Sequence, residues 1–87
     1  MPVALEKEVV EVLEAALSLR GRSASFGRST ALLGALPELD SMGVLNVITM
    51  LEERFAITIH DDAIDSAAFV TVGTLADWLT AQVGQTR

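Results

Sequence analysis

Apolar side chains return every three or four residues along most of this chain, which is the spacing of one face of an α-helix. Residues 3–19, 41–55 and 72–84 each carry such a stripe, and residues 60–69 can supply one or two further turns. A long, glycine-spaced connection over residues 20–40 separates the first two stripes. We therefore predict an all-α fold, a small antiparallel four-helix bundle with three long helices, a short third helix and a long first loop.

The length and composition of the chain fit a single small core. Its 87 residues are about the size of one small domain, so we predict one domain over residues 1–87 with a core of about residues 3–84. Hydrophobic residues make up 51% of the sequence and charged residues 21%, which excludes a disordered chain. The absence of cysteine excludes disulfides, thiolate zinc sites and cysteine nucleophiles.

The sequence indicates neither a membrane span nor a signal peptide. No apolar run approaches the ~18–20 residues that cross a bilayer, and the N-terminus lacks a basic stretch followed by an apolar one. We therefore expect a cytoplasmic protein that acts as a monomer.

Negative charge is concentrated in the second half of the chain. Residues 1–37 carry equal numbers of acidic and basic side chains, whereas residues 38–87 carry the whole formal charge of −6. A surface of this sign repels phosphate backbones, so we do not expect nucleic-acid binding. It suits partners with basic patches, although the same acidity can serve solubility alone.

The helical stripes identify a core and leave part of the second helix exposed. The side chains expected in the core are Leu5, Val9, Val12, Leu13, Ala16, Val44, Val47, Ile48, Leu51, Phe55, Val72, Leu75, Ala76, Leu79 and Val83, with Trp78 at the edge of the last stripe and Leu32, Leu33, Leu36 and Leu39 anchoring the loop. Met42 and Leu45 fall on the opposite side of the second helix, near Glu52 and Glu53. Two large apolar side chains beside carboxylates indicate a docking surface.

Catalytic residues find little support in the sequence. His60 is the only imidazole, and nothing supplies a nucleophile elbow or an oxyanion pocket beside it. We therefore expect His60 to be an exposed residue near a helix start, and the protein not to be an enzyme. Asp61, Asp62 and Asp65 do not follow an EF-hand pattern, so we expect them to cap and solvate the short helix and hold no metal.

Ser41 lies where the long loop meets the second helix, directly after Asp40. Aspartate and serine are preferred N-cap residues, so Ser41 can be a cap and nothing more. The same place also suits an attached group, because a hydroxyl at a helix N-terminus is exposed and the helix dipole favours a phosphate there. The residues that surround the pair bear on this choice.

Those surroundings resemble the acyl carrier protein family over about residues 3–84. The family's Asp-Ser-hydrophobic triplet corresponds to Asp40-Ser41-Met42, and its Glu-Glu-x-Phe helix end corresponds to residues 52–55. An Ile57-Thr-Ile segment, an acidic short helix and a last helix that starts after Thr71 follow in the family's order. A long loop before the serine is a further feature of the family.

The resemblance implies a role for each matching residue. Ser41 would carry 4′-phosphopantetheine, attached from coenzyme A by a phosphopantetheinyl transferase that uses magnesium, and Asp40 would help that enzyme recognise the site. Met42 and Leu45 would be the apolar part of a docking face for acyl-loading and acyl-using enzymes. Glu52 and Glu53 would be its acidic part, which meets basic patches on those partners.

Two departures from the family's fatty-acid-synthesis type favour a carrier dedicated to another pathway. Gly43 and Asn46 stand where that type commonly has carboxylates, and the loop is unusually basic with Arg20, Arg22 and Arg28. The resemblance then implies lipid, polysaccharide or peptide-like secondary biosynthesis, such as a stand-alone carrier of an exopolysaccharide or exosortase gene cluster. Two alternatives stay open: an aminoacyl or peptidyl carrier with the same chemistry, and an acidic helical adaptor that is never modified.

Overall fold

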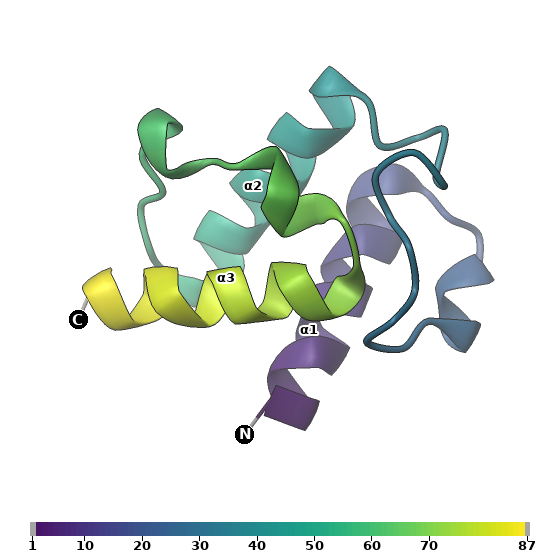
Figure 1. The fold of residues 1–87 in the computed structure, drawn as a ribbon, viewed down its shortest axis with the longest axis horizontal. Coiled ribbons are helices and arrows are strands. Elements are labelled where there is room, and N and C mark those ends of the chain that lie inside the picture. The colour runs from purple at the N-terminus through teal and green to yellow at the C-terminus, as the bar shows by residue number, and fades with distance from the viewer. Residues whose placement is uncertain (1, 87) are drawn as a thin grey trace.

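The computed structural model describes residues 2–86. Its α-helices are α1 (Pro2–Leu17), α2 (Ser41–Phe55) and α3 (Val72–Thr86), and its 3-10 turns are η1 (Arg22–Ser25), η2 (Asp61–Ala63) and η3 (Ser66–Phe69). Figure 1 shows α1 and α2 running in opposite directions with α3 laid across them. No β-strand occurs among the described residues, so the predicted all-α fold is confirmed. Across residues 2–86, no helix combines the length and apolar character that a membrane crossing requires.

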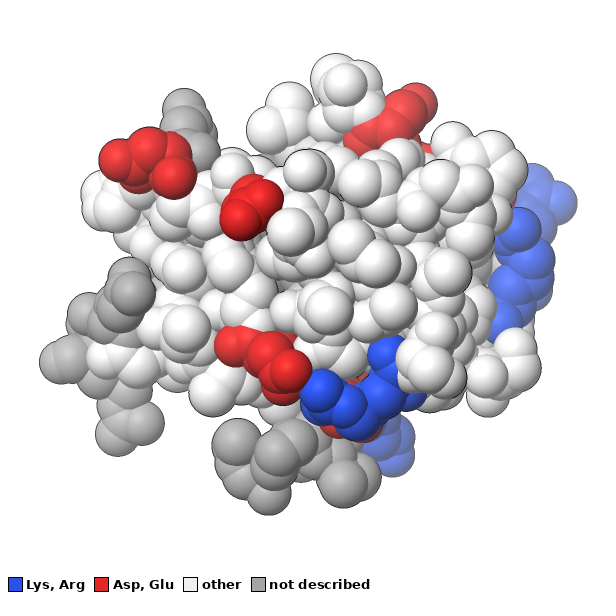
Figure 2. Space-filling view, viewed as in Figure 1, with Lys and Arg blue, Asp and Glu red and all other residues white. Residues whose placement is uncertain are grey.

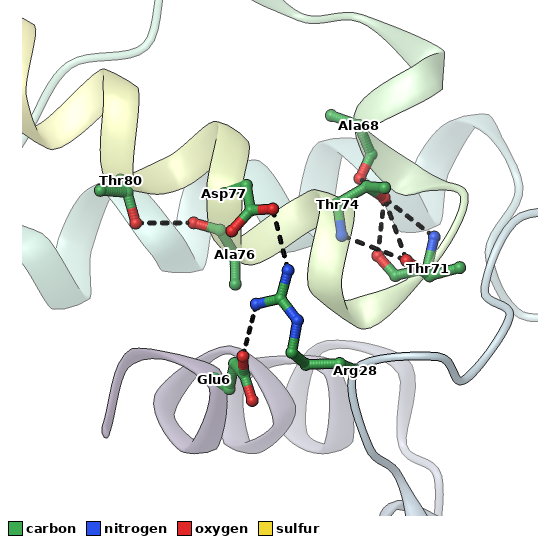
Figure 3. A network of polar contacts seen from close by, with 8 residues as sticks. All are labelled: Glu6, Arg28, Ala68, Thr71, Thr74, Ala76, Asp77 and Thr80. Carbon is green, nitrogen blue, oxygen red and sulfur yellow. Dashed lines mark hydrogen bonds and ion pairs between the residues drawn. The ribbon is translucent and has the colours of Figure 1, made fainter. Parts of the chain in front are cut away.

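Side-chain caps fix where α2 and α3 begin. The Asp40 carboxylate accepts a hydrogen bond from the Gly43 N–H at 2.8 Å, which satisfies one of the free donors in the first turn of α2. At α3, the Thr71 and Thr74 hydroxyls each accept a bond from the other residue's N–H, at 3.1 and 3.0 Å (Figure 3). The capping of the last helix by Thr71 and the predicted bounds of the second helix are therefore confirmed.

The predicted short third helix is two separate 3-10 turns, η2 and η3. The chain is extended at Asp65, with φ −128° and ψ 125°, which interrupts any continuous helix over residues 60–69. Asp65 instead caps η3 by accepting a hydrogen bond from the Ala67 N–H at 3.0 Å. This segment still packs against α3, as a third helix would, because Ala68 and Phe69 are buried.

The core lies where α1 contacts both α2 and α3. Its largest fully buried side chains are Phe69, Leu13, Leu19, Leu32, Leu51, Leu75, Leu79, Val9, Val12, Val47 and Val72. The predicted stripes therefore supply most of the core. Phe55, which the sequence stripe placed in the core, is only partly buried at the end of α2. The large aromatic side chain in the core is instead that of Phe69. Trp78 packs on Phe69 with ring centroids 6.2 Å apart.

The long loop is held against the start of α3 by backbone hydrogen bonds. Leu32 and Leu33 donate to the carbonyls of Val70 and Phe69 at 2.8 and 2.9 Å, around an isolated antiparallel bridge between Ala31 and Thr71. In such a pairing neighbouring side chains point to opposite sides. Leu32 and Phe69 are accordingly buried, whereas Leu33 and Val70 are exposed. The prediction of Leu33 as a loop anchor was wrong for this reason.

Three arginines join segments that lie far apart in the sequence. Arg28 lies between Glu6 of α1 and Asp77 of α3, as Figure 3 shows, and its carbonyl accepts the Gly73 N–H at 2.8 Å. Arg54 at the end of α2 pairs with Glu8 and Glu11 of α1. Arg22 pairs with Glu38 just before α2. Much of the positive charge therefore serves to tie the loop and the helices together.

Candidate functional site

Ser41 is the first residue of α2, and its side chain is exposed. Asp40, not Ser41, is the N-cap of the helix. The Ser41 hydroxyl forms no hydrogen bond with any residue that the structure describes. This hydroxyl is therefore free to react, while the cap that stabilises the helix start is supplied by its neighbour.

An exposed stripe runs along α2 from this serine. Met42 and Leu45 are 65% and 51% exposed, so their predicted place away from the core is confirmed. Asn46, Thr49 and Glu53 continue the same face at helical spacing, and all three are exposed. We call these five residues the α2 stripe. It presents apolar groups close to Ser41 and a carboxylate at its far end.

The two glutamates predicted as acidic contacts lie in different surroundings. Glu53 is exposed and pairs with no described residue. Glu52 is partly buried, and its carboxylate accepts a hydrogen bond from the Ile59 N–H at 2.7 Å. Glu52 therefore fixes the extended link after α2, which leaves Glu53 as the freer of the two charges.

Gly43 lets the loop approach α2 closely. A Cβ atom at this position would overlap the Glu38 carbonyl oxygen and would lie 3.0 Å from Cδ2 of Leu17 and 3.4 Å from Oδ1 of Asp40. Only glycine fits without moving the loop backbone. The residue that departs from the fatty-acid-synthesis type, and that is a poor helix former, thus has a packing reason in this chain.

Ion pairing leaves the free negative charge mostly around α2 and the link after it. Arg22, Arg28 and Arg54 pair with five carboxylates, those of Glu6, Glu8 and Glu11 of α1 and of Glu38 and Asp77, and so offset three of these five negative charges. Figure 2 shows basic side chains at the right and lower edges of one face, with acidic ones scattered over the remainder. The exposed carboxylates without a salt bridge include Asp40, Glu53, Asp62 and Asp65. A partner with basic groups therefore meets negative charge from both ends of α2.

Among the described residues, hydrogen bonds shift the pKa values of Glu14, Arg28 and Arg54. Hydrogen bonds from the Ser23 hydroxyl and then the Gly21 N–H lower the pKa of Glu14, because they stabilise its carboxylate. Hydrogen bonds to Glu6 and then Asp77 raise the pKa of Arg28, and those to Glu11 and then Glu8 raise the pKa of Arg54. Both arginines therefore stay charged throughout the physiological range.

The remaining polar candidates from the sequence are His60 and the aspartates that follow it. His60 is exposed, as expected. No cluster of three or more metal-ligating side chains occurs among the described residues, and the Asp61 side chain lies outside them. Asp65 caps η3. An open cleft of about 220 Å³ lies elsewhere, between α1, the loop and the start of α3, and is lined by Glu6, Lys7, Val10, Phe26, Gly27 and Val72.

Sequence patterns did not predict the exposure of two apolar residues or the ion pairs that the loop arginines form. Leu33 and Val70 are 43% and 48% exposed, because the bridge between the loop and η3 turns them outward. Leu32-Leu33 and Phe69-Val70 are adjacent apolar pairs in the sequence, so no alternation shows which member of each pair faces outward. Arg22 and Arg28 find partners 16 to 49 residues away, which no local pattern reveals.

Comparison with known proteins gives one informative match. No family model matches the chain, and no curated protein matches it either. Among solved structures, the chain is similar to a holo acyl carrier protein from Nitrosomonas europaea, determined by solution NMR. The two are 42% identical over 92% of this chain and 95% of the other, with a TM-score of 0.82. Proteins of this kind are carriers and not enzymes. Identity at this level over nearly the full length of both chains means that this chain belongs to the acyl carrier protein family.

Proposed function

We propose that this protein carries acyl groups as thioesters on 4′-phosphopantetheine attached to the Ser41 hydroxyl, and presents them to biosynthetic enzymes. The observation that carries the proposal is the division of labour at the start of α2. Asp40 caps the helix, and the exposed Ser41 hydroxyl is not used in any hydrogen bond among described residues. Family membership supports the cofactor, since the similar Nitrosomonas europaea protein is a holo form.

The residues around Ser41 suit the attachment of a phosphodiester. In the transfer reaction the serine oxygen forms a bond to the phosphorus that carries the pantetheine of coenzyme A and gives its proton to a base of the transferase. The bond between that phosphorus and the bridging oxygen of the pyrophosphate breaks, and the nucleotide part leaves as adenosine 3′,5′-bisphosphate. The positive end of the α2 dipole lies at this oxygen and favours the negative charge of the attached phosphate. The terminal thiol of the attached arm supplies the atom that holds the acyl group, so the absence of cysteine is no obstacle.

The α2 stripe is the surface that we propose partners use. Met42 and Leu45 offer apolar area beside the modified serine, and Glu53 offers a free carboxylate at the other end of the helix. Asp40 has its side chain exposed while Oδ1 caps the helix, so it can contact a transferase without leaving its place. The phosphopantetheinyl transferase and the acyl-loading and acyl-using enzymes are therefore expected to carry basic patches beside an apolar one.

The differences between this sequence and the fatty-acid-synthesis type of the family support a narrower proposal for the cargo and the pathway. Asn46 stands in place of a carboxylate on the α2 stripe, and Gly43 stands in place of one in the first turn of α2, where it is buried against the loop. We propose a carrier for a dedicated lipid, polysaccharide or peptide-like pathway, with an aminoacyl or peptidyl carrier as the alternative. Analysis of the cargo on protein purified from its native host distinguishes these pathways directly.

The test of attachment compares intact masses after incubation with coenzyme A, magnesium and a broad-specificity transferase. Wild type should gain the mass of one phosphopantetheine, and Ser41→Ala should gain none while circular dichroism shows that it remains folded. Ser66→Ala is the matched control, because Ser66 also follows a capping aspartate but starts only a short 3-10 turn. Modification that persists in folded Ser41→Ala contradicts the site. Wild type that resists several transferases would favour the unmodified adaptor.

A further inference from the structure

We propose that the ion pair between Arg22 and Glu38 holds Asp40 and Ser41 in the orientation that the transferase reaction needs. Arg22 and Glu38 are then positioning residues for that reaction. This inference rests on the proposed function and extends it to residues outside the α2 stripe. Neither residue belongs to the Asp-Ser-Met triplet or to the Glu-Glu-x-Phe end of the helix. Both lie on the loop, one in η1 and the other two residues before Asp40.

The first step is the anchoring of Arg22. Its Nε donates to the Leu19 carbonyl at 3.1 Å, and its terminal nitrogen pairs with Oε2 of Glu38. The turn that carries it is itself fastened to α1. Oε2 and Oε1 of Glu14 accept the Gly21 N–H at 3.0 Å and the Ser23 hydroxyl at 2.6 Å. The guanidinium is therefore anchored by the segment that follows α1, and it holds the Glu38 carboxylate.

The second step is the effect on Glu38. Its other carboxylate oxygen, Oε1, is buried and has no hydrogen-bond partner among the described residues. The Glu38 side chain as a whole is 34% exposed, so Arg22 and water share the compensation of its charge. Without the arginine, hydration of the carboxylate favours a swing of the side chain towards water, which pulls on the backbone of residue 38.

The third step links that backbone to the reacting serine. The Glu38 carbonyl lies so close to Gly43 Cα that no Cβ fits between them, and Leu39 is anchored in the core at 4% exposure. The Gly43 N–H in turn is held by Asp40. Residues 38 to 43 therefore form one tightly packed turn around Ser41. A shift at Glu38 changes the orientation in which the Ser41 oxygen is presented.

The experiment compares transferase kcat/KM among two single variants and the double variant that combines them. Arg22→Gln and Glu38→Gln should each lower kcat/KM about tenfold, because displacement of a reacting atom by a fraction of an ångström is costly in group transfer. The double variant Arg22→Gln with Glu38→Gln should be no slower than either single variant, because both residues act through one ion pair. Arg54→Gln is the matched control: it removes an arginine that also pairs with carboxylates, but at the far end of α2, and its rate should equal that of wild type.

A second readout needs no transferase. Hydrogen exchange of the Gly43 amide should be several-fold faster in Arg22→Gln than in wild type, and unchanged in Arg54→Gln, since that amide reports on the Asp40 cap. Wild-type kcat/KM and wild-type exchange in Arg22→Gln would overturn the inference. A double variant about a hundredfold slower than wild type would overturn it as well, because two independent losses would mean that the transferase contacts the two charges separately.

These outcomes are separate from failure of the proposed function. If wild type accepts no phosphopantetheine, the carrier role is contradicted, yet the exchange measurement still decides whether Arg22 and Glu38 fix the turn. If wild type is modified at Ser41 and the single variants are modified as fast, the carrier role stands and the positioning role does not.

Discussion

The two ends of α2 are built in opposite ways. At its start, Ser41, Met42 and Leu45 are exposed, and among the described residues the only side-chain hydrogen bond to the first turn is the Asp40 cap. At its end, Arg54 is tied to Glu8 and Glu11 of α1, and Glu52 is tied to the Ile59 N–H. Side-chain bonds to α1 and to the link thus hold the end of the helix, whereas close packing of residues 38–43 holds its start and leaves the outward side chains there accessible to an enzyme. Four predictions test this comparison.

The largest effect is expected from two matched leucine deletions on α2. Leu51 is fully buried towards the end of the helix, so Leu51→Ala should lower the free energy of unfolding by about 2–5 kcal/mol. Leu45 is half exposed near its start, and Leu45→Ala should change it by less than about 0.5 kcal/mol. Urea denaturation of both variants measures the difference. Equal losses would mean that the start of the helix is as buried as its end.

A glycine pair tests how tightly the loop closes on the start of α2. Gly43→Ala should lower the free energy of unfolding by about 1–3 kcal/mol, because the added methyl meets the Glu38 carbonyl and Leu17. Gly84→Ala in α3 should instead raise it by up to about 1 kcal/mol, since nothing lies within 4 Å of its new Cβ and alanine favours helix. Thermal melting of the two variants provides the measurement, and a stabilised Gly43→Ala would contradict the close approach.

Substitution of Glu52 and of Glu53 distinguishes a stabilising role within the fold from a role in partner docking. Glu52→Ala removes the acceptor of the Ile59 N–H and should cost about 1 kcal/mol of stability. Glu53→Lys should leave melting almost unchanged but slow modification by a transferase with a basic patch, and salt should reduce the difference from wild type. Melting curves and modification rates at two ionic strengths provide both readouts. A Glu53→Lys protein modified at the wild-type rate at low salt would remove Glu53 from the docking face.

The smallest effect is expected at Glu14, which holds the loop beside the start of α2. Its pKa is lowered in the folded protein, so it contributes stability at neutral pH that is lost as the pH falls through that lowered pKa. Ser23→Ala removes the strongest of its hydrogen bonds and should move the pKa back up towards the ordinary glutamate value. NMR titration of the Glu14 carboxyl measures the change. Ser25→Ala is the control, because the Ser25 hydroxyl donates to Arg22 and not to Glu14.

Sequence patterns predicted those features of the fold that depend on neighbours along the chain. The bounds of α2 follow from the Asp40 cap and the stripe of Val47, Ile48 and Leu51, all of which are buried. The exposure of Met42 and Leu45 follows from the same helical period. The role of Ser41 stays a prediction, although the choice between cap and free hydroxyl is clearer now that Asp40 is known to be the cap.

Features that depend on contacts between distant segments could not be predicted in the same way. Helical spacing gives Phe55 a place on the core face, but that face has ended at the last turn of α2, so Phe69 fills the centre instead. Gly43 looks like a weak helix residue until the loop backbone is known to lie against it. The arginines of the loop look like free positive charge until Glu6, Glu38 and Asp77 are placed beside them.

The position of Arg28 also bears on the order in which the protein is completed during synthesis. Its partner Glu6 precedes it by 22 residues, whereas its partner Asp77 follows it by 49 residues. Its carbonyl accepts a hydrogen bond from the Gly73 N–H, which also comes later in the chain. A nascent chain emerges from the ribosome N-terminal end first, so the loop lacks half of its attachments until α3 has been made. Contacts between residues so far apart also form late in folding. The loop that leads from α1 to Ser41 therefore reaches its final conformation only after α3 has docked.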